Sequence, residues 1–392
     1  MFEEIIAFAQ EHCQDDPLKL ALQQRRYPSI DLGLVAQQLE GRRQALAKWP
    51  SLVSCQQYFF PPKINREQSS SETTAKYKAD LFRQLNGRTF ADLTGGMGID
   101  TYFIGREAEC ADYFELNTNL FGITEHNLAV LQQTQIHCHN TDSIQHLTEH
   151  NTTYDLILID PARRNDHGAK VVAFEDCIPN LLDNLAMIRN RCRYLMVKAS
   201  PMIDLRQAMQ QLGNVEAIHI ISVNGECKEV LFLIPGNQTS HATQTHCVNL
   251  ESTDCAISFS PEQESLTPPL FASAMGLYIY EPNASIMKGG CYNILGQQFA
   301  IAQLARNTHL YTSDTWVENF PGRKFRVLQE IALNAKEAKK ALPEGKAHVA
   351  TRNYPMAAAD LQKKLKLKEG GNLFIIAATL GSKPLGWLCE KC

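Results

Sequence analysis

The sequence lacks the features that would place the chain in a membrane or outside the cell. Among its 392 residues, no apolar run approaches the roughly 20 residues that a helix needs to cross a bilayer. The start, Met1-Phe2-Glu3-Glu4, is acidic and lacks the basic-then-apolar order of a secretory signal. We therefore expect a cytoplasmic protein that has no membrane contact.

The twelve cysteines form neither a disulfide framework nor a paired metal motif. The sole Cys-x-x-Cys runs from Cys389 to Cys392, and one such pair is at most half of a zinc site. Scattered thiols of this kind are typical of the reducing cytosol. We expect no structural metal.

The two signs of charge are unevenly distributed along the chain, although the net charge is only −4. From residue 316 to 392 there are 14 Lys and Arg against 7 Asp and Glu, a balance of +7. The other 315 residues carry 24 against 35, a balance of −11. A basic module on an acidic body predicts binding of a polyanion, and a lysine-rich solvated helix face is the alternative explanation.

A glycine-rich stretch organises the rest of the chain: Phe90-Ala91-Asp92-Leu93-Thr94-Gly95-Gly96-Met97-Gly98-Ile99-Asp100. A short apolar run ends in an acid, and a tight turn and a helix start follow. Glycine allows the backbone to turn sharply and to approach a ligand closely. The pattern predicts a nucleotide-type site, with a dinucleotide, a mononucleotide phosphate or S-adenosylmethionine (SAM) as alternatives. The third glycine of the dinucleotide motif G-x-G-x-x-G is missing, because Thr101 stands in its place.

Strand-like and helix-like runs alternate from residue 88 to 234, which predicts a doubly wound α/β sheet. Asn224-Gly225 separates the last two strand-like runs and predicts a hairpin, so the final strand should be antiparallel. The expected strands are 89–93, 110–115, 135–139, 155–160, 194–197, 215–222 and 229–234.

The flanking segments predict three further parts. Residues 1–65 should form a helical subdomain, and Ser69 with Glu72 should cap a helix that leads into the 66–235 sheet domain. Residues 236–315 should hold a polar connector, with room for one strand pair, and a small α+β unit. Residues 316–392 should form a basic α+β domain, with a helical stripe of apolar residues between 325 and 342.

Four polar clusters should meet at one edge of the sheet, because ligands bind beyond the carboxyl ends of parallel strands. Glu115 can accept hydrogen bonds from ribose hydroxyls, and Asp142 can reach an adenine amino group. Each feature alone has a structural explanation, such as an exposed strand end for Glu115 or a helix cap for Asp142. The clusters are Asp92 with Thr94, Gly95, Gly96 and Gly98; Glu115; Asp142; and Asp160-Pro161-Ala162-Arg163.

Together these clusters resemble a class I SAM-dependent methyltransferase of the nucleic-acid-modifying kind. The stretch 92–98 resembles the D-L-x-x-G-x-G motif, and Glu115 followed by Glu125-His126-Asn127 resembles the ribose-binding acid and its helix. Residues 160–163 resemble the [DNS]-P-P-[YFW] catalytic motif, from which they depart at two positions. The whole chain resembles bacterial methyltransferases with a ferredoxin-like unit and a THUMP-like C-terminal domain. This implies a Rossmann-like seven-stranded sheet, SAM as cofactor and RNA as partner.

The resemblance implies that the enzyme aligns a nucleophile with an activated methyl group. Asp160 would accept an N–H bond from an exocyclic amine, and Pro161 would aim a backbone carbonyl at the same amine. Arg163 replaces the usual aromatic residue, so a guanidinium or a nearby ring such as Phe174 would stack on the base. Arg163 and Arg164 are alternatively a phosphate clamp. Attack at pyrimidine C5 is disfavoured, because Lys198-Ala199-Ser200-Pro201 offers no cysteine.

Three functions are the leading candidates at the level of sequence, and a nicotinamide enzyme is the remaining competitor. The first is a methyltransferase that acts on RNA, with an exocyclic amine of an rRNA or tRNA base favoured. The second is a methyltransferase for a protein or a small molecule. The third is an RNA-binding protein that keeps the SAM fold without turnover.

Overall fold

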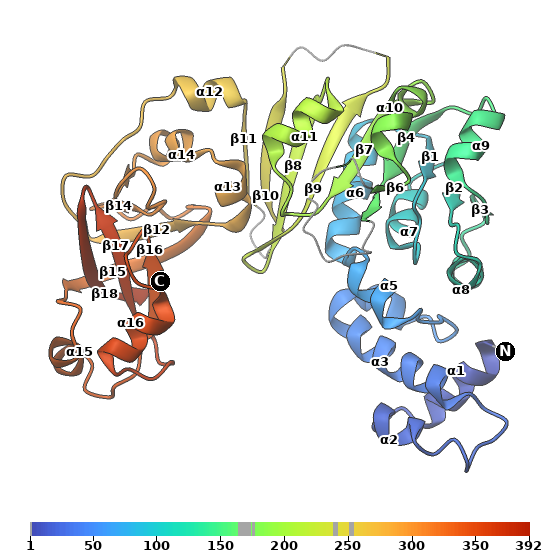
Figure 1. The fold of residues 1–392 in the computed structure, drawn as a ribbon, viewed down its shortest axis with the longest axis horizontal. Coiled ribbons are helices and arrows are strands. Elements are labelled where there is room, and N and C mark those ends of the chain that lie inside the picture. Colours follow the sequence, from blue (N-terminus) through green and yellow to red (C-terminus); the bar gives the residue numbers. More distant parts are fainter. Residues whose placement is uncertain (1, 164–173, 175–176, 238–241, 251–254) are drawn as a thin grey trace. The chain divides into compact units, whose positions relative to one another are not determined.

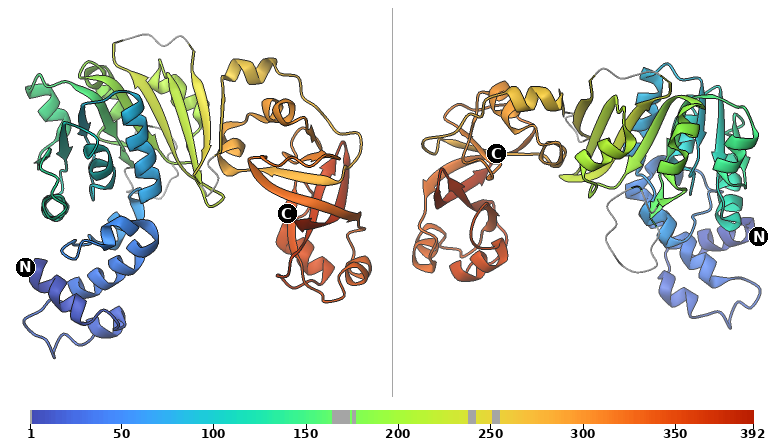
Figure 2. Two further views of the ribbon diagram at one scale, coloured as in Figure 1. Left: turned by 180° about the vertical axis from the view of Figure 1, so that it is seen from behind. Right: turned by 45° about the horizontal axis from the view of Figure 1, so that its top comes forward.

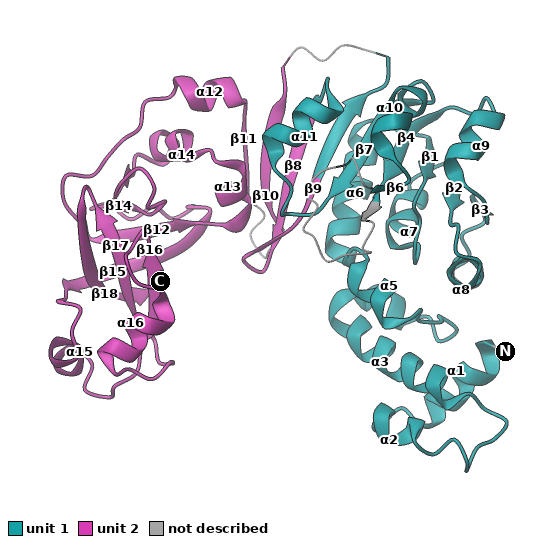
Figure 3. Cartoon of the chain, viewed as in Figure 1, with its two compact units in different colours: residues 1–216, 231–241 teal, residues 217–230, 242–392 magenta. Residues whose placement is uncertain are grey.

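The computed structural model describes residues 2–163, 174, 177–237, 242–250 and 255–392. Figure 1 shows the elements in chain order. The chain divides into two compact units, residues 1–216 with 231–241 and residues 217–230 with 242–392 (Figure 3).

Five helices form the N-terminal part, as the sequence predicts. Asp16 caps α2 and Asp31 caps α3, each by accepting hydrogen bonds from two backbone N–H groups of the first turn. Apolar side chains of α1 and α3 enclose a small core around Phe59. The helices are α1 (Phe2–Glu11), α2 (Pro17–Ala21), α3 (Leu32–Lys48), α4 (Pro50–Val53) and α5 (Lys63–Gln68).

The N-terminal helices are fixed to the sheet domain through α8 (Thr118–Val130). The buried side chain of Asn127 bonds both backbone groups of Phe59, with 2.8 Å for each contact. His126 Nε2 lies 3.0 Å from the carbonyl oxygen of Gln57. The segment around Phe59 therefore packs against α8.

The predicted sheet is present, and its strand order is β11-β10-β8-β9-β7-β4-β1-β2-β3. The seven predicted strands are all confirmed, with small shifts at their ends. Parallel pairing joins β3, β2, β1, β4 and β7 in that order. The seven strands are β1 (Thr89–Asp92), β2 (Cys110–Phe114), β3 (Ile136–His139), β4 (Tyr154–Ile159), β7 (Cys192–Ala199), β8 (Ala217–Val223) and β9 (Glu226–Pro235).

The predicted hairpin between β8 and β9 is also present. Asn224 and Gly225 have φ values of 52° and 75°, as the two central residues of a tight hairpin require. The two strands are neighbours in the sheet and run antiparallel, because only two residues connect them.

The sheet has nine strands rather than the seven that were predicted. The strand pair allowed within the polar connector is β10 (Gln244–Asn249) and β11 (Cys255–Phe259). It extends the sheet, because β10 pairs in parallel with β8 and β11 pairs antiparallel with β10.

Helices cover both faces of this sheet. Figure 1 shows α10 and α11 in front of it, and the reverse view in Figure 2 shows α6 on the other side. Ser71, rather than the predicted Ser69, caps α6, and the Glu72 carboxylate binds Ser51 instead. The helices are α6 (Glu72–Gln84), α7 (Ile99–Gly105), α9 (Ser143–Glu149), α10 (Leu181–Arg189) and α11 (Leu205–Leu212).

A second sheet of seven strands occupies the C-terminal part, in the order β13-β14-β12-β15-β18-β17-β16. Antiparallel pairing of β12 with β15 joins its two halves. The strands are β12 (Tyr278–Pro282), β13 (Ala302–Gln303), β14 (Tyr311–Ser313), β15 (Gly322–Glu330), β16 (His348–Arg352), β17 (Leu373–Leu380) and β18 (Lys383–Lys391). The helices are α12 (Pro261–Leu266), α13 (Ala284–Gly289), α14 (Tyr292–Phe299), α15 (Ala335–Ala341) and α16 (Ala358–Leu365).

The predicted helical stripe over residues 325–342 is wrong in its first half. Residues 322–330 form strand β15, and only α15 is helical. A register shift between Val327 and Gln329 interrupts the alternation of the strand, and Leu328 is exposed. Phe325, Leu328 and Ile331 stand three apart in the sequence, which imitates the spacing of a helix.

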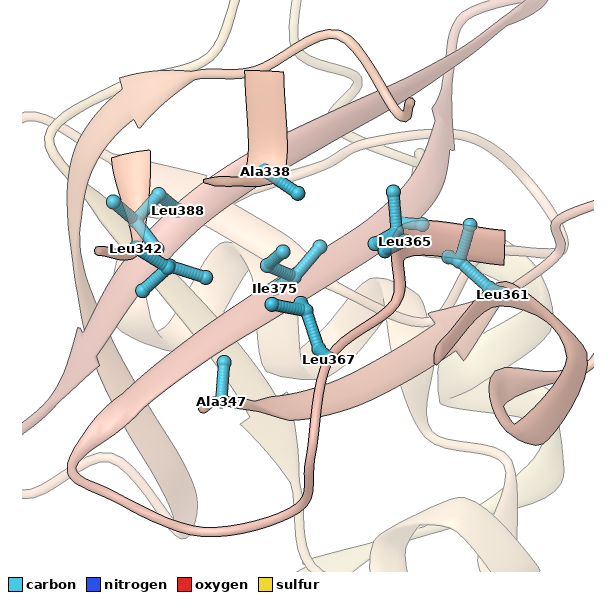
Figure 4. Packing of buried hydrophobic residues seen from close by; sticks show 9 residues of the cluster. Ala338, Leu342, Ala347, Leu361, Leu365, Leu367, Ile375 and Leu388 are labelled. Atoms are coloured by element: carbon cyan, nitrogen blue, oxygen red, sulfur yellow. The ribbon is translucent and has the colours of Figure 1, made fainter. Parts of the chain in front are cut away.

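Helices α15 and α16 pack on one face of the second sheet. Figure 4 shows the buried side chains of Ala338, Leu361 and Leu365 meeting Ile375 and Leu388 of the sheet. This core holds the two helices in place and leaves their lysine-rich outer faces in solvent.

Candidate functional site

The glycine turn after β1 has the compact geometry that the sequence predicts. Gly98 precedes α7 with a φ of 72°, and its N–H donates to the carbonyl of Gly95 at 2.8 Å. A Cβ atom on Gly95 would lie 2.1 Å from the ring of Tyr113, and one on Gly98 would lie 2.6 Å from Thr124. Larger residues would therefore push the turn away from β2 and α8.

Glu115 lies at the end of β2, directly beside this turn. Its Oε2 accepts the N–H of Gly96 at 3.1 Å, and its Oε1 accepts the N–H of Asn117 at 2.7 Å. The carbonyl of Gly96 in turn accepts the hydroxyls of Tyr113 at 2.6 Å and Thr124 at 3.0 Å. The carboxylate is thus fixed at the rim, and its remaining lone pairs can accept hydroxyl groups of a ligand.

Asp92 supports the turn from inside the protein. Its carboxylate is 2% exposed and accepts the N–H of Thr94 at 3.1 Å and the hydroxyl of Thr101 at 2.7 Å. Burial raises the pKa of this carboxyl to about 7, against the hydrogen bond from Thr101. Direct contact of Asp92 with a cofactor stays a prediction.

Asp142 lies at the start of α9 and caps it. Its Oδ1 accepts the N–H groups of Ile144 and Gln145, so the structural role that the sequence allowed is present. The neighbouring Ser143 donates to the carbonyl of Leu93 at 2.9 Å, which ties this helix start to the end of β1. The adenine contact of Asp142 stays a prediction.

Asp160 follows β4, and a hydrogen bond attaches it to the glycine turn. Its N–H donates to Thr94 Oγ1 at 2.7 Å, so the first and fourth clusters of the sequence lie together. After Pro161, Ala162 and Arg163 form the short strand β5, which pairs with β6 (Cys177–Ile178). Arg164 lies outside the described residues.

A group of charged side chains that sequence reasoning missed surrounds Asp160. Ile159 of β4 pairs with Val197 of β7, which places Lys198 beside Asp160, and Lys198 Nζ donates to Asp160 Oδ2. Lys198 is 11% exposed and also lies 3.6 Å from Asp100 Oδ2. The register between two neighbouring strands was the signal that could have found this pair.

Asp100, on α7, lies between Lys198 and Lys78, a lysine of α6. Its Oδ1 lies 3.1 Å from the ammonium of Lys78, which is fully buried, and its Oδ2 accepts the hydroxyl of Ser70 at 2.7 Å. Burial acts to raise the pKa of the Asp100 carboxyl, but Lys78 and Lys198 lower it below its ordinary value. The four charged groups alternate in sign: Lys78, Asp100, Lys198 and Asp160.

Phe174 does not provide the stacking ring that the sequence suggested. Its side chain is 3% exposed and packs edge-on against Phe232, with 6.2 Å between ring centroids. A ring in the core cannot face a base.

The described residues contain no group of three or more His, Cys, Asp or Glu that could hold a metal ion. None of the helices in this part of the chain combines the length and the apolar composition that crossing a membrane requires.

The residues at the rim fit a nucleoside-type cofactor such as SAM. Glu115 offers carboxylate oxygens for ribose hydroxyls, and a Cβ atom on Gly96 would have the Thr94 carbonyl oxygen, at 3.8 Å, as its nearest neighbour. Thr94 and Asp160 close the other side of the turn. These contacts bring together the predicted residues of the glycine turn, Glu115 and Asp160. Asp142 is next in sequence to Ser143, which bonds the carbonyl of Leu93.

Fold and site place the chain in the methyltransferase fold class, an α/β protein with further ferredoxin-like and THUMP-like domains. Residues 278–321 match a ferredoxin-like domain and residues 322–391 match a THUMP domain-like family. The chain is similar over its full length to a provisionally assigned methyltransferase from Porphyromonas gingivalis W83, with 26% identity, a TM-score of 0.88 and 98% of that chain covered.

Two further similarities are confined to part of the chain. A provisionally assigned RNA methyltransferase from Pyrococcus horikoshii matches 36% of this chain and 66% of its own, at 16% identity and a TM-score of 0.28. A provisionally assigned methyltransferase from Escherichia coli matches 45% of this chain and 88% of its own, at 16% identity and a TM-score of 0.30. No curated protein matches the chain in sequence.

Proposed function

We propose that this protein is a SAM-dependent methyltransferase that acts on RNA. The observation that carries the proposal is the meeting of Glu115, the glycine turn and Asp160 at one edge of the sheet. The full-length similarity to the Porphyromonas gingivalis protein supports the same reaction class. SAM, when bound, supplies an activated methyl group on a sulfonium.

The residues of the rim have separate roles in this proposal. Glu115 holds the ribose of the cofactor, and Asp142 reaches its adenine. The turn from Thr94 to Gly98 positions the cofactor close to the backbone. Asp160 orients the acceptor group of the substrate, and Pro161 follows it two residues after the end of β4.

The C-terminal domain supports RNA as the substrate. Its THUMP-like segment carries eight exposed lysines on α15, α16 and the adjoining loops, against four acids over residues 335–369. Lysine ammonium groups bind phosphates and release counterions, which favours any polyanion. The lysines are Lys336, Lys339, Lys340, Lys346, Lys363, Lys364, Lys366 and Lys368.

The test is transfer of label from radioactive SAM to RNA by the purified full-length protein. RNA from cells that lack the protein should be labelled, and Asp160→Ala should abolish labelling while SAM affinity falls by no more than about tenfold. Labelling of protein or metabolite pools instead of RNA would contradict the RNA substrate. Binding of SAM without transfer to any pool would contradict the enzyme.

The role of the C-terminal domain is tested with point variants rather than by truncation at residue 316. Strand β15 pairs with β12, so such a truncation would remove the central partner of the remaining strands. Lysine variants on α15 and α16 leave the sheet intact.

A further inference from the structure

The surroundings of Asp160 contain a cation where the sequence predicted an acceptor carboxylate alone. Lys198 Nζ donates to Asp160 Oδ2, and the Asp160 side chain is 41% exposed. A substrate group that reaches Asp160 therefore also approaches the ammonium of Lys198. The acceptor site is a carboxylate–ammonium pair.

This cation is fixed rather than solvated. Lys198 is 11% exposed, and Asp100 lies 3.6 Å behind its ammonium. Asp100 is itself held by Lys78 at 3.1 Å and by the hydroxyl of Ser70 at 2.7 Å. A charge with so little solvent access is screened weakly, so its effect on neighbouring charge is large.

We infer that the atom methylated by this protein is an oxygen, the 2′-hydroxyl of an RNA ribose. An amine acceptor becomes more positive as it takes a methyl group, and the nearby ammonium of Lys198 would oppose that change. A hydroxyl acceptor becomes more negative as it loses its proton, and the same ammonium stabilises that change. This acceptor replaces the exocyclic amine that the sequence favoured, and it rests on the proposed RNA methyltransferase function.

The transfer balances with the residues present. The hydroxyl oxygen bonds to the methyl carbon as the carbon–sulfur bond breaks and leaves its electron pair on sulfur. Asp160 accepts the hydroxyl proton and releases it to solvent, to which its side chain is open. The products are a ribose methyl ether, the neutral thioether and one proton.

The first experiment identifies the methylated atom. RNA labelled with radioactive SAM is hydrolysed in alkali, which cleaves only next to a free 2′-hydroxyl. We expect the label in alkali-stable dinucleotides. Label in mononucleotides would overturn the oxygen assignment but leave RNA methylation standing, and RNA without label would overturn both.

The second experiment needs no turnover. The cofactor is a cation before transfer and its thioether product is neutral, so the ratio of their dissociation constants reports the charge near the reacting sulfur. Lys198→Met should raise the preference for SAM over S-adenosylhomocysteine by about threefold to tenfold, and Asp160→Asn should lower it similarly.

Matched variants keep this measurement interpretable. Lys76→Met, on the same helix as Lys78 but 58% exposed and paired with Glu72, should leave the ratio unchanged. Lys198→Arg keeps the charge and should also leave the ratio near its original value. An unchanged ratio in both Lys198→Met and Asp160→Asn, with normal thermal unfolding, would overturn the inference.

Discussion

The two sheets use charged residues in opposite ways. Beside the first sheet, Lys78 is fully buried and Lys198 is only 11% exposed, and each lies close to a carboxylate. In the C-terminal domain, the lysines of α15 and α16 lie in solvent. Burying a charge is unfavourable unless it is paired, so the first arrangement fixes position. Exposed charges cost little and attract a polyanion over about one Debye length, roughly 8 Å at physiological salt.

The largest effect should come from Asp160, the part-exposed carboxylate that pairs with Lys198. Asp160→Ala removes the group that orients the acceptor, and we expect methyl transfer to fall by about 10²- to 10⁴-fold. The measurement is single-turnover transfer with SAM affinity recorded beside it. Equal losses of SAM affinity and of transfer rate would mean that Asp160 supports the cofactor rather than the acceptor. The proposed difference between the two regions would then be wrong.

The next largest effect is expected in the pH dependence of stability, because Asp92 is buried. Its pKa of about 7 exceeds the unfolded value, so the folded state holds the proton more tightly. The free energy of unfolding should therefore fall as pH rises from about 4 to about 7, by roughly 2–4 kcal/mol, and level off above. Asp100 and Lys198 are the charged groups nearby.

The matched variant for this effect is Asp92→Asn, which keeps one oxygen acceptor, replaces the other with an NH2 donor beside Thr94 and Thr101, and cannot ionise. Denaturant unfolding at several pH values should show a flatter curve for the variant. Identical curves for both proteins would show that folding does not raise the pKa of Asp92.

Substitution of Gly95, in the tightly packed turn, can be compared with substitution of Gly122, which has open space around it. A Cβ atom there would lie 2.1 Å from the Tyr113 ring, so Gly95→Ala should destabilise by about 1–3 kcal/mol and weaken SAM binding. Gly122 lies within α8 with no neighbour inside 4 Å of such an atom. Gly122→Ala should be neutral or stabilising by up to about 1 kcal/mol, and thermal unfolding compares the two.

The smallest effect should come from the exposed lysines. Changing Lys339 and Lys340 to Gln should weaken RNA binding about tenfold and reduce the salt slope by about 1.4 if both contact phosphates. Lys19 and Lys63 of the N-terminal helices, also exposed, are the control pair. Equal loss from both pairs would show that RNA binding follows total charge and not the lysines of α15 and α16.

Local sequence signals were enough to predict the first seven strands of the sheet and the position of Glu115 at the site. Asn224-Gly225 specifies its hairpin within two residues, and Glu115 lies at a strand end that the pattern locates. The role of Lys198 could not be predicted from local signals, because its ion pair with Asp160 depends on the pairing and register of β4 and β7. The ion pair of Lys78 with Asp100 could not be predicted either, because it depends on the packing of α6 against α7, which no local spacing encodes.

Polar strands and interrupted strands account for the errors. Strand β10, Gln244–Asn249, contains Gln, Thr, His and Asn, so its composition resembles a connector although it pairs with β8. In β15 the register shift near Leu328 hides the two-residue period. Both errors arise where pairing with a distant strand determines the conformation.

The pairing of β12 with β15 has a consequence for how this protein can be divided. The ferredoxin-like segment ends at residue 321 and the THUMP-like segment starts at residue 322, yet their strands are hydrogen-bonded neighbours from Tyr278–Arg326 to Pro282–Gly322. Two segments that share a sheet should unfold in one cooperative transition. Anyone who transplants the lysine-bearing helices to another enzyme will have to carry the ferredoxin-like strands with them.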